Sequence, residues 1–308
     1  MNALERPIVC IVGPTASGKT AAAIELAIAL EGEIVSADSV QLYRRLDAGT
    51  AKPTAEQRAA VRHHMIDVAD PVEIYSAVRY AQEAIRAIEE AEGRGALPFL
   101  VGGTGQYVAA ITQGLSPAPA PPNPELRGRL EDDLRSRGLA ALAARLADID
   151  PRAAETVDLH NPRRVLRALE VRLATGRSIR ELERPGRPAR RALVLGLTVE
   201  RGELSRRIAA RAAAMFEAGL VDEVRGLAAM GYSWGSVVGV ALGYKQVLGY
   251  LLGRAGLTEA REETVAATRR YARRQMTWFR NRERVEWFDA RADTVKRMRR
   301  RIDVFLEA

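Results

Sequence analysis

Short apolar runs alternate with longer amphipathic stretches along this chain of 308 residues. Continuous apolar runs of four to eight residues are typical of parallel strands that are buried on both faces. Helical spacing follows most of these runs, and strands that alternate with helices predict a doubly wound α/β fold. The expected strands are residues 7–12, 33–37, 97–101, 193–199 and 285–288, and the expected helices of this region are residues 19–30, 75–92, 203–230, 258–281 and 294–306.

The strand pattern is interrupted between residues 115 and 191, where we find no convincing strand. Helical spacing fills the gap at residues 124–137, 139–149, 151–156 and 161–175, behind a proline-rich stretch at residues 116–124. We therefore expect an α/β core made of residues 1–115 and 192–308, with a helical insertion domain at residues 116–191. Surface helices of a single domain would give the same pattern, because linkers alone do not fix domain boundaries.

Composition excludes several classes of protein. No apolar run approaches the ~18–20 residues that cross a bilayer, and no signal peptide is evident at the N-terminus, so we expect a cytoplasmic protein without membrane contacts. The single cysteine, Cys10, excludes an internal disulfide framework and a cysteine-based zinc site. Cys10 lies in the first expected strand and is interpreted as a core residue.

Positive charge is unevenly distributed. The formal net charge is +8, but 43 of the 47 cationic residues are arginine, and such a bias makes the total weak evidence for nucleic acid. Residues 269–301 hold 13 Arg or Lys against four acidic residues, an excess of nine, so the rest of the chain is nearly neutral. The C-terminal segment is therefore the candidate for contact with a polyanion.

A phosphate-binding motif follows the first expected strand. Residues 13–20 fit G-x-x-x-x-G-K-[ST] in full and open a helix, as this motif requires. Backbone N–H groups and the helix N-terminus would face phosphate oxygens, with Lys19 neutralising charge and Thr20 ligating Mg²⁺. The α/β core is therefore expected to have a P-loop NTPase-like parallel sheet. The motif indicates an oligophosphate or diphosphate and does not by itself indicate ATP. Its residues are Gly13, Pro14, Thr15, Ala16, Ser17, Gly18, Lys19 and Thr20.

Asp38 comes directly after the second expected strand, at the edge where open α/β sheets bind ligands. A carboxylate there could be a general base, a Mg²⁺ ligand through water, or the N-cap of a helix, and position alone does not separate these roles. His63 and His64 are adjacent but lack a third ligand, which argues against a metal site.

Six segments together resemble one family. GPTASGKT, DSVQLYRRLDAGTAKPT, HHMIDVADP, FLVGGTGQY, LGYKQ and RRYARRQMTWFR occur in this order, and with them nearly the whole chain closely resembles the tRNA dimethylallyltransferases. One departure is Lys245, where the family often has arginine, and either cation suits a phosphate.

The resemblance implies an enzyme, a prenyltransferase. It would transfer a dimethylallyl group from dimethylallyl diphosphate to N6 of the adenosine 3′ of the anticodon in tRNA. The P-loop would then hold the leaving diphosphate with Mg²⁺, Asp38 would be the general base, and Thr15, Lys19 and Arg211 would assist the reaction. The implied partners are the tRNA anticodon stem-loop and dimethylallyl diphosphate, and we expect a monomer.

The resemblance also implies contacts with tRNA from three segments and one threonine. Without it, the arginines among them would be read as a solvated helix face. The implied residues are Asp38, Ser39, Val40, Gln41, Thr104, Arg163, Arg164, Val165, Leu166, Arg167, Ala241, Leu242, Gly243, Tyr244, Lys245 and Gln246. The basic helix at residues 269–284 interleaves arginines with Tyr271, Trp278 and Phe279; we expect the aromatics to be buried and the arginines to face phosphates.

Three other functions fit parts of the pattern. A P-loop kinase or NTPase would turn over ATP without RNA, and a non-catalytic RNA-binding protein would bind tRNA without turnover. An enzyme that prenylates free adenine nucleotides is a closer rival, but a free nucleotide does not need the helical insertion or the basic C-terminal segment.

Overall fold

A computed structural model describes residues 6–116, 123–182, 184–185, 190–282 and 284–308. The chain divides into two compact units, which are described separately. The first unit, the α/β core, combines Met1–Thr112 with Pro188–Ala308, and the second, the helical unit, is Gln113–Arg187. In the part of the chain that the structure describes, no helix is both long enough and apolar enough to cross a membrane.

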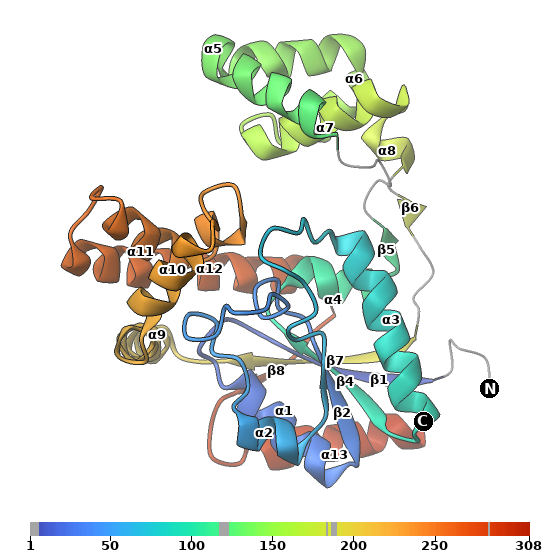
Figure 1. Cartoon of the computed structure of the whole chain (residues 1–308). Coiled ribbons are helices and arrows are strands. Elements are labelled where there is room, and N and C mark those ends of the chain that lie inside the picture. Colours follow the sequence, from blue (N-terminus) through green and yellow to red (C-terminus); the bar gives the residue numbers. More distant parts are fainter. Residues whose placement is uncertain (1–5, 117–122, 183, 186–189, 283) are drawn as a thin grey trace. The chain divides into compact units, whose positions relative to one another are not determined.

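The α/β core is built on a six-stranded sheet whose strands all run parallel, which confirms the predicted fold class (Figure 1). Its spatial order is β3-β2-β4-β1-β7-β8. The five predicted strands are present within a few residues of their expected ends. The two-residue strand β3 was not predicted, because a pair of histidines has no strand pattern. The strands are β1 (Pro7–Val12), β2 (Gly32–Ser36), β3 (His63–His64), β4 (Leu97–Gly102), β7 (Arg191–Thr198) and β8 (Glu286–Asp289).

Both faces of the sheet are buried, as the continuous apolar runs predict. In β1, Ile8, Cys10 and Val12 belong to one hydrophobic cluster, while Val9 and Ile11 belong to another. Cys10 is fully buried, in agreement with its interpretation as a core residue.

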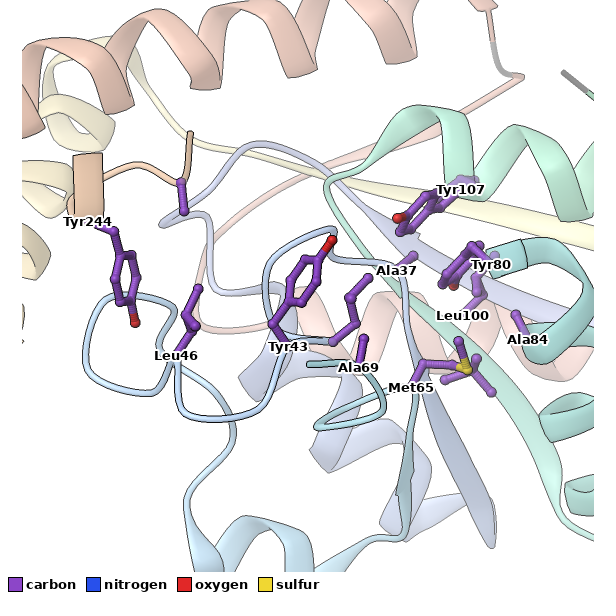
Figure 2. Packing of buried hydrophobic residues seen from close by; sticks show 14 of the residues in the cluster. Ala37, Tyr43, Leu46, Met65, Ala69, Tyr80, Ala84, Leu100, Tyr107 and Tyr244 are labelled. Atoms are coloured by element: carbon purple, nitrogen blue, oxygen red, sulfur yellow. The ribbon is translucent and has the colours of Figure 1, made fainter. Parts of the chain in front are cut away.

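The two clusters divide the helices of the core between the faces of the sheet. The larger cluster includes the stacked rings of Tyr80 and Tyr107, whose centroids are 3.7 Å apart (Figure 2). It is covered by α3 (Ala77–Gly93), α4 (Gly105–Thr112), α9 (Arg201–Glu217), α10 (Leu220–Ala229), α11 (Tyr244–Leu251) and α12 (Leu257–Arg282). The other cluster is covered by α1 (Lys19–Ala29), α13 (Thr294–Glu307) and the end of the short helix α2 (Ala55–Ala60).

The single helix expected at residues 203–230 is two helices, α9 and α10. Gly219 separates them with a φ of 93°, a left-handed conformation that glycine adopts without steric cost. The apolar spacing continues across the break because both helices bury a face against the same cluster. Helical periodicity therefore could not show the turn.

The helical unit has its own apolar core. Its helices are α5 (Pro124–Ile149), α6 (Pro151–Ala154), α7 (Pro162–Thr175) and α8 (Ile179–Leu182). Gly138, with a φ of 77° and a ψ of 170°, interrupts α5 at the point between the two helices that the sequence predicted. The expectation of no strand in this region was wrong: β5 (Leu115–Ser116) and β6 (Arg184–Pro185) pair antiparallel, too briefly for any pattern. The proline-rich residues 117–122 and residues 186–188 lie outside the described residues.

Candidate active site

Three loops leave neighbouring strands at the carboxyl edge of the sheet. The P-loop follows β1, Asp38 follows β2 and Thr104 follows β4, and these strands are adjacent in the order β2-β4-β1. In parallel sheets, loops at the carboxyl ends of adjacent strands form the ligand site. The fold therefore gathers the predicted diphosphate and acceptor residues at one edge.

The P-loop has the backbone of an anion-binding turn. Gly13, Ala16 and Gly18 have φ values of 139°, 64° and 91°, and a Cβ at Gly13 would lie 2.5 Å from the Leu197 carbonyl oxygen. Gly18 is the N-cap of α1 and offers no side chain to its first N–H groups. These N–H groups are left available for a ligand.

Two cations of this site, Lys19 and Arg211, both interact electrostatically with the Asp38 carboxylate. Burial lowers the pKa of Lys19 to about 7; the charge of Arg211 lowers it further and that of Asp38 opposes the shift. Burial also lowers the pKa of Arg211, against the influence of Asp38. Lys19 Nζ donates to the Pro14 carbonyl oxygen at 2.7 Å and Arg211 Nη2 to that of Thr50 at 3.2 Å. The site thus has an excess of positive charge, which a bound anion would balance.

Asp38 is held in place by its own turn. Its Oδ1 accepts hydrogen bonds from the backbone N–H groups of Val40 at 2.9 Å and Gln41 at 3.2 Å. The N–H of Ser39, the residue directly after Asp38, donates to Thr104 Oγ1 at 3.0 Å. No helix begins here, so the N-cap alternative does not apply. The bonds from Val40 and Gln41 both end on Oδ1, so the Asp38 carboxylate is oriented through this one oxygen.

Gln41 stabilises the loop that contains Thr50, whose carbonyl oxygen accepts a hydrogen bond from Arg211. Its Nε2 donates to the carbonyl oxygens of Thr50 and Ala51, both at 3.2 Å, and its Oε1 lies 3.2 Å from Ser36 Oγ. Thr50 O accepts from Gln41 and Arg211 together. Gln41, which was expected to contact tRNA, and Arg211, which was expected to assist at the diphosphate, therefore donate to the same carbonyl oxygen.

Two side chains of α12 enter the site, although the sequence did not predict them as site residues. Gln275 Oε1 accepts from the Thr15 N–H at 2.8 Å, and Gln275 Nε2 donates to the Gly103 carbonyl oxygen at 3.0 Å. Burial, followed by the charge of Asp38, raises the pKa of Tyr271 to about 12, while the nearby side chains of Thr104 and Gln275 oppose this shift. The spacing of four residues between Tyr271 and Gln275, which places both on one helix face, is the signal that could have found them.

The segment 241–246 is anchored by a buried tyrosine. Tyr244 OH donates to Glu223 Oε1 at 2.5 Å and accepts from the Gly49 N–H at 3.1 Å. Ala241 and Gly243 are buried with it, Leu242 and Gln246 are half-buried, and Lys245 is exposed. Of this predicted tRNA-binding set, Lys245 is the residue whose side chain projects most into solvent.

The arginines predicted in the helical unit lie at the start of α7. Asn161 caps this helix through the N–H groups of Arg163 and Arg164, whose side chains are exposed. Arg167 pairs with the buried Glu170 at 3.0 Å. The remaining two predicted residues, Val165 and Leu166, are buried in the core of this unit.

The basic helix α12 has one apolar face and one charged face. Phe279 is fully buried, and Tyr271 and Trp278 are half-buried. The expectation of buried aromatics is therefore confirmed fully for Phe279 and partly for the other two. Among the described side chains of this helix, the exposed arginines are Arg261, Arg269, Arg270, Arg273, Arg274 and Arg280.

Comparison with known proteins decides the family. Residues 41–282 match the model of the family described as IPP transferase, which is well over half of the chain. The chain belongs to the IPP transferase family. It is 48% identical to a tRNA dimethylallyltransferase of Thermomicrobium roseum over 92% of this chain and 86% of that protein. It is 46% identical to a tRNA dimethylallyltransferase of Geobacter sulfurreducens, over 92% of this chain and 91% of that protein.

Solved structures of this family share the fold. A tRNA isopentenylpyrophosphate transferase from Bacillus halodurans is 40% identical, with a TM-score of 0.73, covering 98% of this chain and 97% of that one. A eukaryotic dimethylallyltransferase acting on tRNA is 26% identical, with a TM-score of 0.82, covering 98% of this chain and 80% of that one. The P-loop and Asp38 precede the part of the chain that the family model matches.

Proposed function

We propose that this IPP transferase transfers a dimethylallyl group from dimethylallyl diphosphate to N6 of the adenosine 3′ of the anticodon in tRNA. The products are N6-dimethylallyladenosine and diphosphate. The observation that carries the proposal is that Asp38 lies at the same edge of the sheet as the P-loop, where its charge acts on the half-buried cations Lys19 and Arg211. The activity named for the relatives supports the choice of donor and acceptor.

The diphosphate would lie in the P-loop. The N-terminus of α1, Lys19 and Arg211 present positive charge to the leaving group, and such charge counts for most where water is excluded. Ser17 and Thr20 bring hydroxyl oxygens to this loop, and among the described residues Ser17 Oγ is buried without a hydrogen-bond partner. Hydroxyl, phosphate and water oxygens are the donors that Mg²⁺ prefers, so Thr20 is the protein ligand that we propose. When bound, Mg²⁺ would offset negative charge on the departing diphosphate.

Asp38 would take the proton from the acceptor. The lone pair of N6 is conjugated with the adenine ring, so the amine attacks poorly while it keeps both protons. In the transfer, the bond between N6 and the allylic carbon forms, the bond from that carbon to the diphosphate oxygen breaks, and one N6 proton passes to the Asp38 carboxylate. Because Asp38 Oδ1 accepts two backbone N–H groups, we assign the proton to Oδ2. A positioned base contributes about 10²–10⁴-fold.

The base has to leave its stack to reach Asp38, as in other enzymes that act on a base. Thr104, whose Oγ1 accepts the Ser39 N–H, would contact the acceptor nucleotide. Lys245 and the exposed arginines of α12 are suited to RNA phosphates, as are Arg163 and Arg164 of the helical unit. Val165, Leu166 and Tyr244 are buried, so we assign them the positioning of these cations and loops.

We further propose that the enzyme acts as a monomer in the cytoplasm. The contacts that join the P-loop, the acceptor loops and α12 are made within one chain, which supports this proposal. Light scattering during size-exclusion chromatography would give the mass of one chain, and a stable dimer would contradict this part.

One assay tests the transfer. The protein is mixed with Mg²⁺, labelled dimethylallyl diphosphate and an unmodified tRNA whose anticodon is followed by adenosine, and label is expected in that nucleotide. A tRNA with guanosine at the same position is the control and should stay unlabelled. Label in free adenine nucleotides but not in tRNA, or ATP hydrolysis without transfer, would overturn the proposal.

A further inference from the structure

Helix α12 connects the two halves of the proposed centre. Tyr271, Gln275 and Trp278 are spaced by four and three residues and therefore share one helix face. Tyr271 lies near the side chain of Thr104, and the indole of Trp278 lies directly against the backbone of Gly105. Thr104 belongs to the turn between β4 and α4, and Gly105 is the first residue of α4. Gln275, between them, reaches this turn and the P-loop at once.

The Gln275 amide joins the P-loop to the acceptor side. Its oxygen accepts the Thr15 N–H of the P-loop at 2.8 Å, and its nitrogen donates to Gly103 O, one residue before Thr104, at 3.0 Å. The side chain is 5% exposed, so water does not compete with these bonds. A buried amide that uses its donor and its acceptor on two different loops fixes the distance between them.

We propose that Gln275 is a positioning residue, which holds the diphosphate loop and the acceptor turn in register for the transfer. The inference rests on the proposed function. The leaving diphosphate lies on the loop that Gln275 holds by Thr15, and the acceptor lies on the turn that it holds by Gly103. The new bond forms between groups bound on these two loops, so alignment between them sets the rate of transfer. Each loop keeps its own ligand contacts when the amide is lost.

Two substitutions break the bridge in different ways. Gln275→Met keeps the length of the side chain and removes both hydrogen bonds. Gln275→Glu keeps an acceptor for Thr15 but places a carboxylate oxygen against Gly103 O, so only the bond to the acceptor turn is lost. Misplacement of about 1 Å costs on the order of 100-fold in rate, and we expect a loss of kcat of this size for both variants, with the KM for tRNA and the affinity for inorganic diphosphate within about threefold of wild type.

A third variant, Gly103→Ala, disrupts the Gln275 hydrogen bonds through a change in the turn between β4 and α4. A Cβ at Gly103 would collide with Gln275 Nε2, and its next nearest neighbours are 3.1 Å and 3.5 Å away, so Gly103→Ala displaces the amide without disturbing the core. It should reproduce the loss of kcat even where Gln275→Met folds poorly. Thr264→Ala is the matched control: Thr264 is buried on the same helix, its hydroxyl donates to Ala260 O of that helix, and kcat should stay near wild type.

The measurements are steady-state and single-turnover rates of prenyl transfer, titration with inorganic diphosphate and thermal unfolding of each variant. If the wild type transfers the prenyl group and Gln275→Met, Gln275→Glu and Gly103→Ala all keep the wild-type kcat, this inference is overturned. Weakened diphosphate binding that accounts for the whole loss would also overturn it, since Gln275 would then shape only the P-loop. No transfer by the wild type would overturn the proposed function instead.

Discussion

The carboxyl edge of the sheet and the start of α7 both carry positive charge, but in different surroundings. Lys19 and Arg211 are half-buried and burial lowers the pKa of both, whereas Arg163 and Arg164 are exposed. A buried charge interacts strongly and over a short range, while exposed charges are screened by salt and water. The first arrangement suits chemistry by a few indispensable groups, and the second suits binding by many replaceable ones.

The sharpest test of this contrast is Asp38→Asn, which keeps the shape and the turn but removes the base. We expect kcat for prenyl transfer to fall by about 10²–10⁴-fold, with tRNA affinity nearly unchanged. Single-turnover assays and tRNA binding would measure both. Asp289→Asn is the control, since this exposed carboxylate lies at the same edge of the sheet at the end of β8. Wild-type turnover in Asp38→Asn would remove Asp38 as the base.

A second effect of burial should appear in the pH dependence of diphosphate binding. The pKa of Lys19 is lowered to about 7, and the charged ammonium is the form that attracts the anion. Affinity should therefore decrease as pH rises above about 7, by at most roughly tenfold per pH unit. Titration with inorganic diphosphate between pH 6 and 9 measures it. Lys19→Arg stays charged throughout, so an equal decrease in that variant would contradict the assignment.

The exposed arginines should give a smaller effect. Arg163→Ala and Arg164→Ala are each expected to weaken tRNA binding by about two- to fivefold, as is usual for exposed charges. Each lost phosphate contact should also lower the slope of log affinity against log salt by about one. With saturating tRNA, kcat should change little. Arg172→Ala, at the other end of α7, is the matched control; an equal loss there would mean that only net charge matters.

The smallest expected effect is that of Ser17→Ala. The Ser17 hydroxyl is 1% exposed and, among the described residues, has no hydrogen-bond partner, so its removal costs no bond. The free energy of unfolding of the ligand-free protein should stay within about 1 kcal/mol of wild type or rise slightly. Urea denaturation measures it. A loss above about 2 kcal/mol would show that this hydroxyl stabilises the fold of the P-loop. The groups at the carboxyl edge of the sheet would then serve stability as well as chemistry, which weakens the contrast with the start of α7.

Local patterns were sufficient for most of the core and for part of the site. Apolar runs predicted five strands, and the P-loop and Asp38 could be placed because each directly follows one of them. The two-residue strands β3, β5 and β6 are too short to have a period, and the break at Gly219 leaves the apolar spacing intact. Gln275 meets Thr15 across 260 residues, so this contact depends on how α12 packs, which no local pattern encodes.

The pairing of β1 with β7 also has a consequence for how the chain folds. Pro7 pairs with Arg191 and Val12 with Gly196, so β1 receives one of its two neighbours only after the entire helical unit has been synthesised. At ~5–20 residues per second, translation separates these strands by on the order of ten to forty seconds. The helical unit, with its own apolar core, can fold in that interval. During this time one edge of β1 stays unpaired, which makes the nascent chain a candidate for binding by chaperones.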